Sequence, residues 1–377
     1  MKISDVTFDL VCRLCARVAP LFIVTVAIMG AWSLCRAADA PYELPLAPFH
    51  SEGKRISAEE NLGAAVVKNL TNALNAGDVD ALEQLANSLL RQKTKTPAGF
   101  LPIRYIHGGI RIYLSQDNED AVKAHTFDRI LETIHAWQKR YPNSGTAIVA
   151  EADVFLRRAL AARGGETIDQ LPPGRLKLFR TNVLIARGVL LEKAKIGKTD
   201  PLWYEKMATV GQYIGADRQQ FLRLIDAGMR DHPEDLEMAD SGVTYMVSRW
   251  GGGDEMVAAY IKHVLSRVSK EDAPIVAARI YYRLLNSGFY YAGSELVYVL
   301  HTSVEQVERA MADVVARYPD PVNVDAQAMV TCALGDKLRL RPLLAEIGDS
   351  PILSHWAAGS APDGSYFSLC RNFAAQN

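Results

Sequence analysis

The sequence predicts an all-α protein in which antiparallel helical hairpins stack into a superhelix similar to that of tetratricopeptide repeats. Three observations support this fold class. Apolar residues recur along most of the chain with the spacing of one helix face. Prolines stand at recurrent junctions between these periodic segments, and the connections are short. The 377 residues, 49% hydrophobic and 23% charged, have the composition of a folded globular protein.

Residues 1–37 are predicted to be a secretory signal peptide. A basic start precedes the uncharged apolar run 19–34, and small residues follow it. Cleavage after Ala37 is favoured over cleavage after Ala40, because the latter would leave Pro41 first. The alternative is an uncleaved anchor in the inner membrane, although the apolar run is shorter than the about 20 residues that span a bilayer. We therefore expect a periplasmic or secreted protein.

Residues 57–93 are predicted to form an N-terminal helical hairpin. The letters SAEE at 57–60 have the form of a capping box, which marks the start of a helix. Gly77 ends that helix, and Asp78 or Asp80 caps the next one. The loop between them is very short, so the two helices are expected to be antiparallel.

Residues 94–118 break the helical pattern. They read TKTPAGFLPIRYIHGGIRIYLSQDN, are rich in Ile and Tyr, and carry Gly108 and Gly109 at the centre. Two apolar runs around a Gly-Gly turn predict a small β-hairpin near 98–115. The alternative is an irregular insert that packs on the helices.

Residues 119–350 are predicted to form the helical repeat domain. The sequence RYPNSGTAIVA around Pro142 ends one periodic segment and starts another, and related junctions surround Pro233 and Pro319. Proline ends a helix because it lacks an amide N–H and its ring clashes with the preceding turn. Helical pairs that recur at about 34 residues stack, because no pair buries its own apolar face.

The same periodicity places the individual helices, with Ser144 and Ser303 as caps. Residues 351–377 are assigned to a C-terminal tail. The helices are predicted over 127–141, 144–163, 176–196, 202–214, 217–230, 234–249, 254–268, 273–287, 303–317, 322–334 and 337–347.

Four segments of the repeat domain resemble a bacterial domain-of-unknown-function family with tetratricopeptide-like repeats. They are WQKRYPNSGTAIVAEADVFLRRALAARGG (137–165), DPLWYEKMATVGQYIG (200–215), SRWGGGDEMVAAYI (248–261) and TCALGDKLRLRPLLAEIG (331–348). The resemblance covers about 120–350 and implies a superhelix, with no established activity or catalytic residues. The chain lacks the W-x-x-L-G-x-x-Y run of standard repeats, so peptide-binding positions cannot be transferred.

Two cysteines remain once the leader, with Cys12, Cys15 and Cys35, is set aside. Cys332 and Cys370 can form a disulfide in an exported protein. The alternative is that Cys332 is a buried small apolar residue within a helix.

No catalytic residue, metal site or cofactor is predicted. The chain contains no H-E-x-x-H, G-x-S-x-G, P-loop or G-x-G-x-x-G motif. His135 and His232 are isolated, and packing or solvation accounts for them. The net charge is −1, and no basic stripe is interleaved with aromatic residues, so nucleic acid is not an expected partner.

Aromatic and arginine side chains are the candidate binding residues. Trp203, Tyr204, Trp250, Tyr282 and Arg283 are predicted to anchor a partner if they are exposed, because aromatic and arginine residues dominate interface energetics. Adjacent residues point in different directions on a helix, so one of each aromatic pair can instead belong to the core.

The run WGGGD at 250–254 has a structural alternative as well. Glycine would end one helix, Asp254 would cap the next, and Trp250 would pack into the bend. Arg249 and Arg279 could add positive charge to a binding groove.

The sequence thus predicts an exported scaffold in the bacterial envelope that binds a protein or peptide on the concave face of its superhelix. A membrane contact is expected only through an uncleaved leader. The alternative is an envelope hydrolase or lyase on a helical scaffold, with acid and base residues that the sequence does not identify.

Overall fold

A computed structural model describes residues 55, 57–92, 94–115, 120–164, 168–290, 292–357 and 364–376. The predicted leader and its cleavage sites lie outside these residues. The described residues belong to one compact unit and contain helices and no strand, which confirms the all-α fold class.

The N-terminal hairpin consists of α3 (Ala58–Ala76) and α4 (Val79–Arg91). The Ser57 side chain accepts a hydrogen bond from the backbone N–H of Glu60, and Asp78 accepts one from Ala81. Gly77 ends α3 in the left-handed region, with φ of 64°. The predicted cap and break are therefore at the predicted positions.

Helix α5 (Arg104–Ser115) lies where a β-hairpin or irregular insert was predicted near 98–115, so that prediction was wrong. The Gly-Gly pair serves helix packing rather than a turn. A Cβ added at Gly109 would lie 2.5 Å from a methyl carbon of Leu70, so glycine lets α5 approach α3 closely. Local composition did not reveal this contact because Leu70 is distant in sequence.

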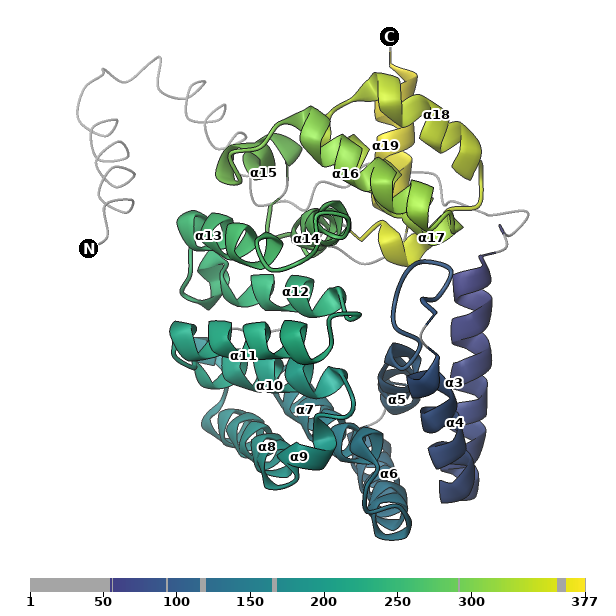
Figure 1. Cartoon of the computed structure of the whole chain (residues 1–377), viewed down its shortest axis with the longest axis vertical. Helices are drawn as coiled ribbons and strands as arrows, with labels where there is room; N and C mark the ends of the chain where they lie inside the picture. The colour runs from purple at the N-terminus through teal and green to yellow at the C-terminus, as the bar shows by residue number, and fades with distance from the viewer. Residues whose placement is uncertain are drawn as a thin grey trace, which may run out of the picture. The chain divides into compact units, whose positions relative to one another are not determined.

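Most of the remaining helices form two rows, and Figure 1 shows their pairs as successive layers. Helices α7, α10, α12, α14 and α17 form an inner row in which each packs on the next, and α8, α11, α13, α16 and α18 pack against them. The helices are α6 (Asp120–Arg140), α7 (Gly145–Arg163), α8 (Pro173–Glu192), α9 (Ala194–Gly197), α10 (Leu202–Ile214), α11 (Arg218–Asp231), α12 (Glu237–Ser241), α13 (Asp254–Leu265), α14 (Ala273–Asn286), α15 (Gly293–Val299), α16 (Val304–Arg317), α17 (Pro321–Leu334), α18 (Lys337–Ile347) and α19 (Ser365–Ala375).

One predicted helix of the repeat domain, at 234–249, is interrupted. It consists of the short α12 followed by 3₁₀ turns at Gly242–Tyr245 and Ser248–Trp250. The chain then folds back, because the backbone N–H of Gly253 donates to the carbonyl of Met246 at 2.9 Å. Asp254 is the first residue of α13 rather than its cap, and its side chain accepts from the Tyr290 hydroxyl at 2.9 Å.

The C-terminal segment 351–377 contains α19 rather than an unstructured tail alone. Cys370 on α19 forms a disulfide with Cys332 on α17, with a Cα–Cα distance of 5.8 Å. Trp356 is fully buried, and its indole N–H donates to Asp325 at 2.8 Å. The disulfide and this hydrogen bond attach the end of the chain to the last inner helix.

Candidate functional site

Trp203 and Tyr204 are core residues, not exposed anchors, which corrects the expectation for both. Their exposed fractions are 3% and 1%. The Trp203 indole N–H donates to the carbonyl of Leu190 at 2.9 Å, and the Tyr204 hydroxyl donates to Asp231. The reason is that α10 has packed neighbours on several sides, namely α7, α8, α11 and α12, so both adjacent side chains meet a partner helix.

Tyr282 and Arg283 also bind within the chain. The hydroxyl of Tyr282 lies 2.7 Å from Nδ1 of His355, and Arg283 forms an ion pair with Asp240 at 2.8 Å. Of the five predicted anchors, Trp250 lines a pocket whose lining includes none of the other four.

This cavity, which we call the Trp250 pocket, has a volume of about 750 Å³. Helices α7, α8 and α10 and the 3₁₀ turns before α13 surround it. Its lining residues are Arg163, Ile168, Arg180, Val183, Leu184, Gln212, Tyr213, Ile214, Gly215, Tyr245, Arg249 and Trp250.

Trp250 and Tyr213 form an aromatic wall of the Trp250 pocket, with their rings tilted relative to each other. The ring centroids of Trp250 and Tyr213 are 5.8 Å apart, and those of Tyr213 and Phe179 are 5.4 Å apart. The guanidinium of Arg163 lies over the Trp250 ring at 5.4 Å, in a cation–π contact. Burial raises the pKa of Tyr213, although the positive charges of Arg157 and Arg163 oppose the shift. The Tyr213 hydroxyl is therefore neutral at physiological pH and can donate a hydrogen bond.

Three arginines of the pocket lack an acidic partner. No carboxylate of the described residues forms an ion pair with Arg163, Arg180 or Arg249, and the buried Nε of Arg163 has no hydrogen-bond acceptor. Arg218 differs, since it donates to the carbonyls of Tyr245 and Trp250 and so fixes the turn that carries the pocket. The pocket is therefore a positively charged cavity with an aromatic wall.

The sequence indicated only part of this site. Arg249 and Trp250 were singled out, whereas Arg163, Arg180 and Tyr213 were not. These three residues come from the ends or middle of different helices, and no local motif connects them. Only the packing of α7, α8 and α10 brings them together.

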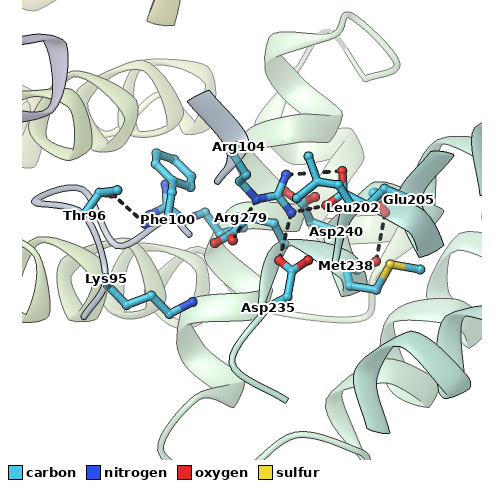
Figure 2. A network of polar contacts seen from close by, with 12 residues as sticks. Lys95, Thr96, Phe100, Arg104, Leu202, Glu205, Asp235, Met238, Asp240 and Arg279 are labelled. Carbon is cyan, nitrogen blue, oxygen red and sulfur yellow. Dashed lines mark hydrogen bonds and ion pairs between the residues drawn. The ribbon is translucent and has the colours of Figure 1, made fainter. Parts of the chain in front are cut away.

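A second cluster of charges is buried around Arg104, as Figure 2 shows. Arg104 lies at the start of α5 and forms ion pairs with Glu205 on α10 and with Asp235 and Glu237 near α12. The Nη2–Asp235 distance is 2.8 Å and the Nε–Glu237 distance is 3.2 Å. Burial raises the pKa of Glu237 to about 7; Arg104 opposes this shift, and the charge of Asp235 adds to it.

Residues 55–107, which we call the N-terminal arm, continue these contacts along the inner row. The buried Arg279 on α14 donates to the carbonyl of Ala98, as does the side-chain amide of Asn323 on α17. Ser57 donates to Asp320 at 2.7 Å. The arm therefore covers the surface of the inner helices that carries these polar groups. A ligand could therefore reach these polar groups only if the arm were displaced.

Among the residues that the structure describes, no group of three or more His, Cys, Asp or Glu side chains could hold a metal ion. Within the same residues, every helix is too short or too polar to cross a membrane. No family model, characterised protein or solved structure matches the chain. The family resemblance stated above thus stays a prediction.

Proposed function

We propose that this protein is an exported helical-repeat scaffold of the bacterial envelope, related to the tetratricopeptide-like family, that binds a protein or peptide partner. We place the binding site in the Trp250 pocket and expect it to take an acidic segment of the partner. The observation that carries the proposal is the combination of three arginines without acidic partners and an aromatic wall in one cavity.

The chemistry of the pocket favours a ligand with both carboxylate and apolar groups. Arginine binds carboxylates through paired hydrogen bonds, and such bonds to charged groups are stronger than neutral ones. Tyr213 and Trp250 offer apolar area with little conformational freedom to lose. The cavity is within the range of about 300–1,000 Å³ that is usual for ligand sites, which is enough for several side chains.

One observation favours the alternative of a hydrolase or lyase, namely the raised pKa of Glu237. A general acid must reach its substrate, however, and the Glu237 side chain is only 4% exposed and paired with Arg104. The Trp250 pocket is accessible, whereas the carboxylates around Arg104 are buried. The structure therefore favours a binding function over a catalytic one.

The test is to capture partners with the tagged protein from its native envelope after mild cross-linking. Wild-type protein is compared with Trp250→Ala and Arg249→Glu, and Arg309→Glu, an exposed arginine on α16, is the matched control. We expect one partner to be retained by the wild type and the control and lost from both pocket variants. Circular dichroism verifies that each variant is folded. Equal capture by all four proteins would contradict the proposed site.

A further inference from the structure

The outward surface of α8 exposes an unusual amount of apolar area. Leu178, Leu184, Ile185 and Leu191 are 56%, 57%, 40% and 44% exposed. Ile214, at the rim of the adjoining Trp250 pocket, is 45% exposed. Exposed large apolar residues scattered singly are ordinary, but several together on one helix mark an interaction surface.

The spacing of these residues suits a helix as the occupant. Leu178 and Ile185 are one heptad apart and so form one ridge, and Leu184 and Leu191 form a second ridge in the same way. Exposed small residues, Thr181 and Gly188, fall between the two ridges, and a Cβ added at Gly188 would meet no other atom. Apolar ridges with small residues between them are the pattern against which the side chains of another helix pack.

The position of α8 in the stack explains why no described helix covers this surface. Among the described helices, α7 and α10 pack extensively against α8, and the short α9 contacts it over a small area (Figure 1). The buried residues that face them include Phe179, Val183 and Leu190. In a helical-repeat stack each hairpin is covered by the next, and an end hairpin without a polar cap leaves a surface for stacking. A helix from a partner would take the position of the next repeat.

The charge of the same surface specifies the partner further. Lys177, Arg180 and Arg187 are exposed, lie toward the Leu184–Leu191 ridge, and have no ion pair with a described residue. The only acidic residue of α8 is Glu192, its last residue. Arg180 and Leu184 also line the Trp250 pocket, so the two surfaces are continuous. A second copy of the same surface would bring like charges together, whereas an acidic helix would bring opposite ones.

We propose that α8 docks an amphipathic α-helix of a partner protein, with its apolar face on the two leucine-containing ridges and acidic residues along one flank. This inference rests on the proposed binding function and names the form of the ligand. The acidic flank would extend toward the arginines of the Trp250 pocket.

The experiment measures binding of a fluorescein-labelled synthetic peptide by fluorescence anisotropy. The peptide is a helix former with leucines at heptad spacing and glutamates along one flank, and the comparison peptide has lysines in place of the glutamates. The protein is tested as wild type, as Leu178→Gln/Leu191→Gln and as Arg187→Glu. Leu338→Gln on α18, where Leu338 is 79% exposed, is the matched control. None of the α8 substitutions changes a residue of the Trp250 pocket.

We expect the glutamate-flanked peptide to bind and the lysine-flanked peptide not to bind. The double leucine variant and Arg187→Glu should each weaken binding about tenfold, the usual effect of removing an interface anchor, with no effect of Leu338→Gln. Absence of binding, or binding that the α8 variants do not change, would overturn the inference. So would binding of vesicles of phosphatidylethanolamine and phosphatidylglycerol in place of the peptide, or self-association through α8.

The two proposals can fail separately. Suppose that Trp250→Ala abolishes partner capture while the α8 variants retain both partner and peptide. This result would support the binding site in the Trp250 pocket and contradict helix docking on α8. If the α8 variants lose the peptide and Trp250→Ala retains both the peptide and the captured partner, the result supports helix docking and contradicts the proposed role of the pocket.

Discussion

At the scale of single residues, burial decides function more than residue type does. Trp203 and Trp250 are both tryptophans near a helix start or turn, yet the first is 3% exposed and the second lines a pocket. The sequence could not predict that Trp203 is buried and Trp250 is not, because the burial of Trp203 depends on which helices surround α10. The caps at Ser57, Asp78 and Ser303 could be predicted, since a cap depends on the next three residues alone.

Glu237 provides a prediction at this scale. Its pKa in the folded protein is about 7, above its ordinary value of 4.5, because it is buried with one arginine shared among three carboxylates. The folded state therefore binds more protons than the unfolded state between these two values, and the contribution of Glu237 to stability falls as pH rises through that window. We expect the free energy of unfolding of the wild type, relative to Glu237→Gln, to decrease by on the order of 2 kcal/mol between about pH 5 and pH 8.

Urea unfolding of both proteins at the two pH values measures this difference. Glutamine keeps a carbonyl that can accept from Arg104, so the comparison isolates the ionisation of Glu237. Parallel pH dependence of the two proteins would show that Glu237 does not titrate in this window.

At the scale of elements, local rules account for the helices and distant contacts account for the exceptions. The Pro142 and Pro319 junctions end helices in any context, so α6, α7, α16 and α17 begin or end near their predicted limits. The interrupted helix at 234–249 was missed, because the turn there depends on backbone hydrogen bonds from Gly253 to Met246 and from Gly252 to Val247.

Two adjacent glycines of that turn, Gly252 and Gly253, are expected to respond differently to substitution by alanine. A Cβ added at Gly252 would overlap the backbone carbonyl of Met246, whereas one added at Gly253 would meet no other atom. Gly253 is also extended, with φ of 173°, which any residue can adopt. We expect Gly252→Ala to destabilise the protein by about 1–3 kcal/mol and Gly253→Ala to have little effect. Thermal unfolding of both variants measures this, and equal midpoints would exclude the backbone clash.

At the scale of the whole molecule, segments from both ends of the described chain are attached to α17, the last inner helix. The Cys332–Cys370 disulfide closes a loop of 38 residues from α17 to α19. The sequence showed that the two cysteines could pair but not that α19 exists, because its contacts with α17 and α18 are tertiary.

A prediction follows for this bridge. A disulfide restricts the unfolded chain, and loss of one that closes a loop of this length costs about 4 kcal/mol. We expect Cys332→Ala/Cys370→Ala to unfold at a lower temperature than the oxidised wild type and at about the temperature of the reduced wild type. Alkylation of the native protein should label neither Cys332 nor Cys370 before reduction. Labelling of both in native material would show that the bridge is absent.

The contacts of the N-terminal arm with α17 have a consequence for the order of folding. Ser57 and Asp320 are 263 residues apart in sequence, so the arm is synthesised long before its acceptor exists. Stacked repeats usually fold through neighbouring contacts and can unravel from one end. Here the long-range closure raises the contact order, which slows folding and couples the first described residues to the last inner helix. Until α17 is synthesised, the groups of the arm that contact it, such as Ser57, have no partner there, and a nascent chain is exposed to aggregation or to a chaperone during that interval.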